Sequence, residues 1–146
     1  MFKNLLVPVS GESITKAELK KAIQLAKLDS AKISLVYVTD PVVPYSSSEV
    51  QSALALSSKE YKKVSAEFAK RVLAKAKAVI GTEIEVGEFH IYHPNIADGI
   101  LEAAKKAKAD VIVMASHKRT GIRGIFLRSE AQEVILHSKI PVLVLG

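Results

Sequence analysis

The sequence contains no cysteine and no tryptophan, and only 5% of its 146 residues are aromatic. Without cysteine, the chain has no disulfide bond, no thiolate nucleophile and no Cys-ligated zinc or iron–sulfur site. Because aromatic residues are scarce, the core must consist of valine, isoleucine, leucine and alanine. The same scarcity disfavours recognition of nucleic acid by base stacking, and no nucleic-acid-binding motif is present.

Long apolar runs are also missing. No segment approaches the roughly 18 apolar residues of a membrane span. The apolar start, MFKNLLVPV, is too short for a signal peptide and is interrupted by Pro8. We therefore expect a cytoplasmic protein without membrane contact, in keeping with the absence of cysteine.

The composition is that of a folded soluble protein, with 49% hydrophobic and 25% charged residues. The length suits one domain covering residues 1–146. The formal net charge is +6, but many lysines recur on the polar side of amphipathic segments. We interpret them as solvated helix faces rather than as a nucleic-acid-binding patch.

Apolar patterning predicts alternating strands and helices. Strands are expected at residues 2–9, 32–39, 83–91, 110–115 and 141–145, and helices at 15–28, 49–80, 95–107 and 129–137. This alternation indicates an α/β fold: an open, five-stranded parallel sheet with helices on both faces, doubly wound and Rossmann-like. The switch point is expected between the first and fourth strands.

Several local features refine this prediction. Gly81 is in the position of a C-capping glycine, and Asn95 is placed to cap the helix that follows it. The alternation in residues 83–91 predicts an edge strand, with a β-bulge where the phase changes at Gly87. The long helix is expected to bury one stripe of residues: Tyr61, Val64, Phe68, Val72, Ala76 and Val79.

The last strand is apolar although it closes the chain and is expected at a sheet edge. An uncharged apolar edge strand promotes aggregation unless another element covers it. Pairing of this strand with that of a second copy about a two-fold axis would cover it. We therefore predict a homodimer whose interface consists of Pro141, Val142, Leu143, Val144 and Leu145.

The order of elements and several segments resemble the universal stress protein family over essentially the whole chain. The resemblance rests on NLLVPVSGES, ISLVYVTDP, HPNIADGILEAAKKAKADVIVMASH and RTGIRGIFLRSEAQEVILHSKIPVLVL. It implies the doubly wound fold, a dimer and a cytoplasmic role in stress survival. Some members of that family bind ATP through a loop of the form Gly-x-x-Gly, nine residues, then Gly-Ser/Thr.

This sequence departs from the ATP-binding loop at every glycine. The three glycine positions hold Ala115, Lys118 and Arg128, and only Ser129 matches. Glycines in such a loop let backbone amides approach the phosphates, and the next helix N-terminus favours the negative charge. Lys118 and Arg128 either fill the phosphate space or replace the lost amides with side-chain charge. We favour the first, and we favour Ser129 as a helix cap with Gln132 over Ser129 as a phosphate ligand.

Other positions that match the family's nucleotide site have mixed character. Where ATP-binding relatives often carry an aspartate after the first strand, this sequence has Ser10, and where they have Gly-Asp-Pro it has Tyr92-His93-Pro94. The remaining positions are three apolar residues near strand ends, one loop histidine and one carboxylate in the first turn of the last helix: Pro8, Val38, Met114, His117 and Glu130. A weak site for ATP or another phosphate-bearing anion is therefore the most that we expect.

Catalytic and metal-binding groups are not evident. Asp40 and Asp110 flank strands without forming a pair, and phosphoryl transfer needs metal-binding carboxylates. His90 and His93 are three residues apart at a strand end, where their side chains point to opposite faces. We therefore expect a non-catalytic, metal-free homodimer that acts on an unknown protein partner. The alternative is an ATP/ADP-binding stress sensor with a basic phosphate loop and at most slow hydrolysis.

Overall fold

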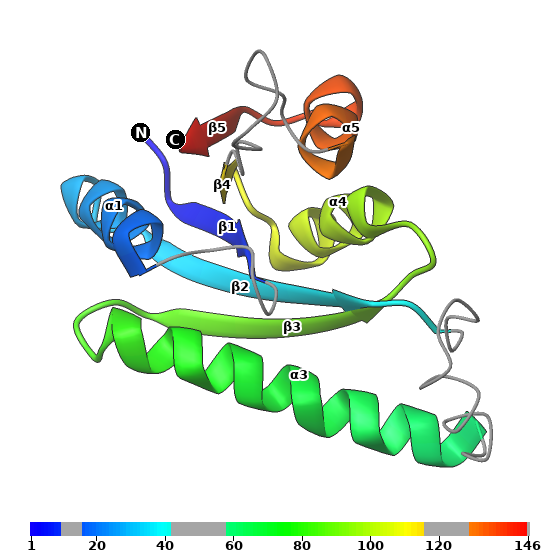
Figure 1. Cartoon of the computed structure of the whole chain (residues 1–146). Helices are drawn as coiled ribbons and strands as arrows, with labels where there is room; N and C mark the ends of the chain where they lie inside the picture. The colour runs from blue at the N-terminus through cyan, green and yellow to red at the C-terminus, as the bar shows by residue number, and fades with distance from the viewer. Residues whose placement is uncertain (10–15, 42–57, 116–128, 146) are drawn as a thin grey trace, which may run out of the picture.

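The computed structural model describes residues 1–9, 16–41, 58–115 and 129–145, and within them a five-stranded parallel sheet flanked by helices (Figure 1). The elements, in chain order, are β1 (Asn4–Pro8), α1 (Lys16–Leu28), β2 (Lys32–Thr39), α3 (Ser58–Ile80), β3 (Val86–Tyr92), α4 (Ile96–Ala107), β4 (Val111–Ala115), α5 (Ser129–His137) and β5 (Val142–Leu145). The strand order is β3-β2-β1-β4-β5. The predicted fold class, and the reversal of strand order between the first and fourth strands, are confirmed.

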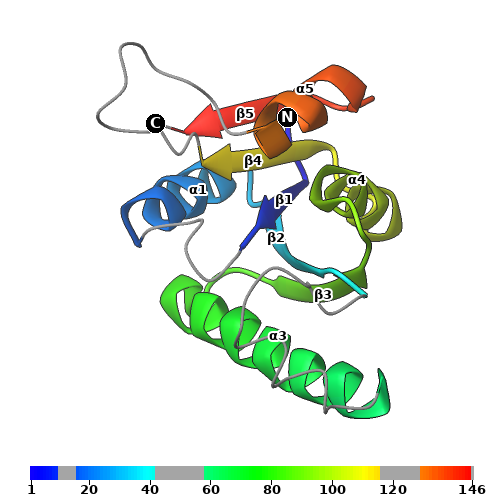
Figure 2. The same cartoon turned by 45° about the vertical axis from the view of Figure 1, so that its right-hand side comes forward.

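The sheet separates two apolar clusters, one on each face. On one face, Leu5, Val7 and Ile33 pack with α1 and α3; on the other, Leu6 and Ile112 pack with α4 and α5. Consecutive residues of a strand point to opposite faces, so Leu5 and Leu6 enter different clusters. Figure 2 shows the sheet edge-on between α1 on one side and α4 on the other. A sheet buried on both faces explains why the central strands are continuous apolar runs.

The predicted core stripe of the long helix is only partly correct. Ala76 is buried, but Val64 and Phe68 are 52% and 43% exposed. The helix buries a neighbouring stripe instead: Ala69, Leu73, Ala76 and Ile80. Small alanine side chains let the helix lie close to the sheet, so the alanine-containing stripe faces the core and Val64 and Phe68 remain exposed. Apolar spacing alone does not distinguish two adjacent stripes.

The predicted bulge at Gly87 is wrong. β3 pairs with β2 one residue to one, from Ile33 with Val86 to Thr39 with Tyr92. The phase change arises because Val86 packs on the α1/α3 side of the sheet, whereas Phe89 packs on the α4/α5 side. β3 is an outer strand, as predicted, but helices cover both of its faces, so apolar residues appear in both phases.

Both predicted helix caps of this region are confirmed. Gly81 has a φ of 84°, and its N–H donates to the carbonyl of Lys77 at 3.0 Å. This left-handed backbone conformation costs little free energy at a glycine, because glycine has no Cβ atom. At the start of α4, the Asn95 side chain accepts from the Asp98 N–H at 3.0 Å. Residues 49–57 of the predicted long helix lie outside the described residues.

A buried polar network joins β1 to α4 and β2. The Asn4 amide donates to the Ala107 carbonyl at 2.8 Å and accepts from the Ser34 hydroxyl at 2.8 Å. The Asp110 carboxylate accepts from the backbone N–H groups of Lys3 and Asn4 at 2.8 and 3.0 Å. These bonds fix the C-terminal end of α4 at the amino edge of the sheet. In the described part of the chain, no helix is long and apolar enough to cross a membrane.

Candidate functional site

The carboxyl ends of β1, β2 and β4 meet beside the point where strand order reverses, the usual ligand position in open α/β sheets. Three predicted site residues lie there: Pro8 ends β1, Val38 is near the end of β2, and Met114 is near the end of β4. Val38 and Met114 belong to the apolar cluster on the α4/α5 face. Strand alternation puts Pro8 on the same face as Leu6, so the structure brings these three positions together on one face.

Val38 has a structural role that the sequence does not reveal. A Cβ atom built on Gly99 of α4 would be only 2.6 Å from the Val38 Cγ1 and 3.0 Å from its Cγ2. Such distances are far below van der Waals contact, so the absence of a side chain at Gly99 lets α4 approach β2. Val38 therefore packs against the α4 backbone, and sequence reasoning missed Gly99 as its partner.

The N-terminus of α4 lies at the same edge of the sheet. The His93 N–H donates to the Thr39 carbonyl at 2.9 Å, and the His93 Nδ1 accepts from the Asn95 N–H at 2.9 Å. His93 therefore connects the end of β2 to the cap of α4. This is a positioning role within the segment that joins β3 to α4.

The phosphate-loop positions are only partly described. Ala115 is the last residue of β4 and is half-buried, and Ser129 is the first residue of α5. Glu130, in the first turn of α5, is half-buried, and a carboxylate there is favourable to the helix dipole. Four predicted site residues lie outside the described residues: Ser10, His117, Lys118 and Arg128.

An aromatic and polar cluster occupies the α3 side of the same edge. His90 Nε2 is 2.7 Å from the Thr39 hydroxyl, and its ring centroid is 4.5 Å from that of Tyr92. The Tyr37 ring lies 5.9 Å from Phe68 and 6.0 Å from His90. Burial lowers the pKa of His90 below its ordinary value, because the apolar surroundings disfavour the charged imidazolium.

His90 and His93 engage different partners, the Thr39 hydroxyl and the Asn95 N–H. Across residues 1–9, 16–41, 58–115 and 129–145, no three His, Asp or Glu side chains are close enough to hold a metal ion. Asp110 lies at the opposite edge of the sheet from Asp40, and its carboxylate accepts hydrogen bonds from the backbone N–H groups of Lys3 and Asn4. The two aspartates therefore do not form a pair, as predicted.

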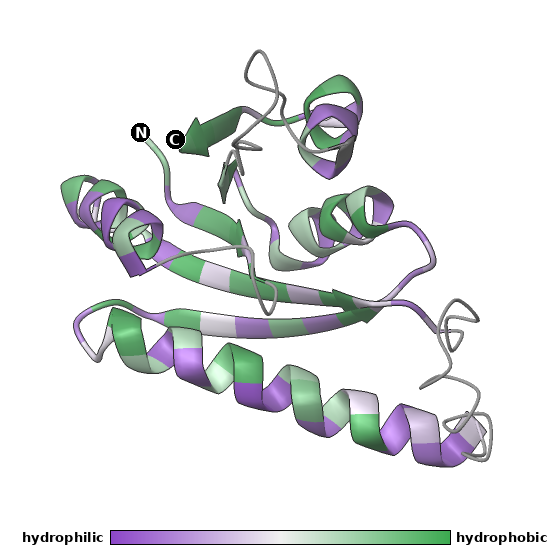
Figure 3. Ribbon diagram, in the orientation of Figure 1, coloured by the Kyte–Doolittle hydropathy of each residue, from purple (hydrophilic) through white to green (hydrophobic). Residues whose placement is uncertain are grey.

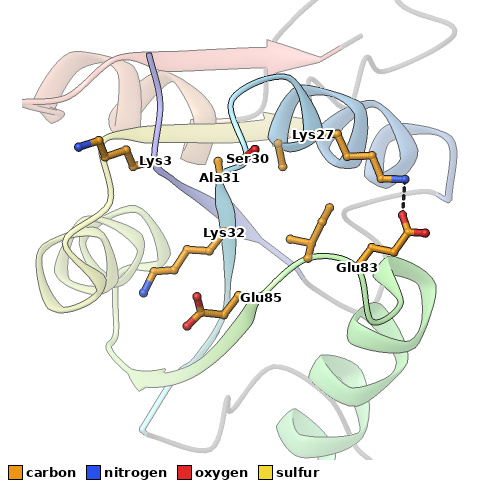
Figure 4. A pocket seen from close by; sticks show the side chains of 9 residues that line it. Lys3, Lys27, Ser30, Ala31, Lys32, Glu83 and Glu85 are labelled. Atoms are coloured by element: carbon orange, nitrogen blue, oxygen red, sulfur yellow. Dashed lines mark ion pairs between the residues drawn. The ribbon is translucent and has the colours of Figure 1, made fainter.

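A cavity of about 360 Å³ opens at the amino edge of the sheet, away from the switch point. Its charged side chains do not converge on one point (Figure 4). Lys27 and Glu83 form an ion pair of 2.9 Å on one side, while Lys32 and Glu85 extend together on the other and Lys3 points away. Paired and diverging charges leave no group aimed at a ligand, so the carboxyl edge is the stronger candidate site.

Comparison with known proteins identifies the class. Residues 1–146 match the universal stress protein family, and the chain belongs to that family. It is 33% identical to a universal stress protein of Methanocaldococcus jannaschii, over 99% of this chain and 82% of the relative. It is 30% identical to a Thermus aquaticus universal stress protein encoded in the 3′ region of a QAH/OAS sulfhydrylase gene, over 99% and 98% of the two chains.

Solved structures share the fold. A universal stress protein from Archaeoglobus fulgidus covers 100% of both chains, with a TM-score of 0.72 and 23% identity. An Archaeoglobus fulgidus member in complex with dAMP has a TM-score of 0.64 and 24% identity, covering 99% of this chain and 98% of that one. Another member, in complex with cAMP, has a TM-score of 0.68 and 19% identity, covering 99% and 97%.

Proposed function

We propose that this protein is a non-catalytic, cytoplasmic stress-response protein that acts as a homodimer through protein contacts and binds ATP weakly or not at all. The observation that carries the proposal is the loss of glycine at the three matching positions of the phosphate loop, of which Ala115 is described at the end of β4. A Cβ at such a position occupies space that a phosphate needs for close contact with backbone N–H groups.

Two features of the described residues support the absence of catalysis. Asp110 is held by backbone N–H groups at the amino edge, so it is remote from the carboxyl ends of the strands. One ring nitrogen of each histidine is hydrogen-bonded within the fold: His90 Nε2 with the Thr39 hydroxyl, and His93 Nδ1 with the Asn95 N–H. Both histidines thus have structural partners at the ends of β2 and α4.

Thermal unfolding with and without ligand tests the nucleotide part of the proposal. Ligand at ~100 times its dissociation constant adds about 2.7 kcal/mol of stability, which raises the melting temperature by roughly 5–10 °C for a chain of this size. With ATP, ADP or AMP at millimolar concentration in the presence of Mg²⁺, we expect the melting temperature to rise by no more than about 1 °C. A shift of several degrees would overturn the proposal.

The dimer is supported by the environment of β5. Among the described residues this strand pairs with β4 alone, and it is hydrophobic along its length in Figure 3. Leu143 is 39% exposed, and Val142, Val144 and Leu145 are half-buried. Pairing with a second β5 would cover these apolar side chains and satisfy the outer backbone groups of the strand.

Light scattering on the purified protein tests the dimer. We expect twice the chain mass at micromolar concentration, and Leu143→Lys to shift the mass toward that of one chain. Val64→Lys is the matched control, since Val64 is 52% exposed on α3, away from β5. A wild-type protein that remains monomeric at high micromolar concentration contradicts the dimer.

A second candidate function is an adenine-nucleotide sensor. It is favoured by the family members solved with dAMP and cAMP, and by the apolar positions Pro8, Val38 and Met114 on one face of the site. The ratio of absorbance at 260 and 280 nm shows whether the purified protein carries a nucleotide. If nucleotide binds, Lys118→Gly and Arg128→Gly distinguish the two roles of these residues: tighter binding means that the side chains obstructed the site, and lost binding means that they were ligands.

A further inference from the structure

A second cavity, of about 460 Å³, lies between α4, α5 and the segment that leads into β5. Both helices run antiparallel to the strands, so their C-terminal ends meet here, at the edge of the sheet where the strands begin (Figure 1). Pro8, Val38 and Met114 lie at the opposite edge, where the strands end. We call this cavity the α4/α5 groove. Its volume is in the range of small-molecule sites, which are typically about 300–1,000 Å³.

The floor of the groove is apolar and continuous with the core. Leu101, Ala104, Ala109 and Ile140 line it, and all four belong to or pack against the apolar cluster of the α4/α5 face. The wall at Ile140 is fixed locally, because the Ser138 hydroxyl donates to the Ile140 carbonyl at 2.7 Å and lies 3.2 Å from the Ile140 N–H that donates to it. Such a floor removes apolar ligand surface from water without a rearrangement of the loop.

The rim of the groove is positively charged. Lys105, Lys108 and Lys139 line it, all exposed, and none has a carboxylate within ion-pair distance among the described residues. The carboxylate on the rim, Glu102, is 3.4 Å from Lys106 Nζ, and His137 is 3.2 Å from Glu133. Glu102, the carboxylate that lines the groove, is therefore compensated by Lys106, and Glu133 is not among the lining residues.

The alternative explanation for these lysines is that they complement the helix C-termini. Each C-terminus carries about −0.5 charge, so two contribute roughly −1 against +3 from the three lysines. About two positive charges remain uncompensated above an apolar floor. This combination fits a small molecule with an apolar body and a single carboxylate, and it does not fit a cation.

We propose that the α4/α5 groove binds an anionic amphiphile, such as a medium-chain fatty acid, with its tail on the Leu101–Ala104–Ala109–Ile140 floor and its carboxylate among Lys105, Lys108 and Lys139. A small ligand matches the groove better than a protein does, because a stable protein interface buries more than about 1,000 Å². The groove lies at the opposite edge of the sheet from Pro8, Val38 and Met114, so the proposal stands whether or not nucleotide binds.

Titration of ¹⁵N-labelled full-length protein with decanoate below its micellar range tests the proposal. We expect saturable amide shifts concentrated in residues 101–109 and 137–140. Decylammonium, with the same tail and the opposite charge, should bind at least tenfold more weakly. Shifts spread over the whole surface, no saturable shift, or equal affinity for the two probes would overturn the proposal.

Three variants make the test independent of folding defects. Lys105→Glu/Lys139→Glu should weaken decanoate binding at least tenfold, while Lys63→Glu/Lys70→Glu, the same charge change on exposed α3 positions, should leave it unchanged. Ala109→Leu should fill the floor and weaken both probes alike. An equal loss in the α3 control, or no loss in the groove variant, would show that binding is nonspecific and would contradict the proposal.

Discussion

The Val38 side chain occupies the space that a Cβ atom on Gly99 would need, with Cγ1 only 2.6 Å from that position. This contact sets how closely α4 lies on β2 at the candidate site. It also explains why a glycine stands inside a 12-residue helix, where glycine costs about 1 kcal/mol relative to alanine.

Gly99→Ala should therefore destabilise the protein despite its better helix propensity. Overpacking of this kind costs about 1–3 kcal/mol, more than the propensity gain in most cases. Denaturant unfolding measures the change. In the double variant Val38→Ala/Gly99→Ala the clash is relieved, so its loss of stability should be smaller than the sum of the single losses by about 1 kcal/mol or more. Strictly additive effects would show that the two residues are not in contact.

Ser34→Ala should destabilise the protein through Asn4. Ser34 and Asn4 are 1% and 5% exposed, and removal of the Ser34 hydroxyl leaves the Asn4 side-chain oxygen without its 2.8 Å donor. A buried polar group left without a partner costs about 1–3 kcal/mol. The control is Ser65→Ala on α3, whose hydroxyl contacts the Lys62 carbonyl and the Tyr92 hydroxyl, each at 3.1 Å. The Tyr92 hydroxyl keeps its own bond to the Lys62 carbonyl, so the expected change is below about 0.5 kcal/mol. Equal effects of the two substitutions would contradict a buried network.

His90 should make the stability depend on pH. Burial lowers the pKa of His90 in the folded protein below the ordinary 6.5, so the unfolded chain binds more protons below that pH. The contribution of His90 is thus fully present above pH 6.5 and is lost as the pH falls below it. Unfolding free energies between pH 5 and 8 should show a loss on acidification that His90→Gln reduces. If wild type and variant have the same slope in this window, His90 is not the cause.

The fold was predictable because its signals are local and strong. Residues 32–39 match β2 at both ends because apolar residues predominate in that segment. Residues 129–137 match α5 at both ends, and their start carries the Ser-x-x-Gln pattern of a capping box. The buried stripe of α3 was not, because two adjacent stripes have the same spacing and only the packing of Ala69 against the sheet decides between them. The phase change at Gly87 suggested a bulge, whereas it reflects helices on both faces of an outer strand.

The candidate site was predictable only in part. Strand ends and the reversal of strand order placed Pro8, Val38 and Met114 at one edge of the sheet. The role of Gly99 and the bond from the His93 N–H to the Thr39 carbonyl depend on how the start of α4 lies against β2. A tertiary contact of that kind leaves no periodic signal in the sequence, so it could not be predicted from residue spacing.

Equilibrium binding of adenine nucleotides tests the central claim most directly. Isothermal titration of the purified, nucleotide-free protein with ATP, and separately with dAMP, in the presence of Mg²⁺ measures the affinity. Loss of the three loop glycines at Ala115, Lys118 and Arg128 predicts dissociation constants in the millimolar range or no measurable heat. A dissociation constant in the low micromolar range for either nucleotide would contradict the account and establish the protein as a nucleotide-binding member of its family.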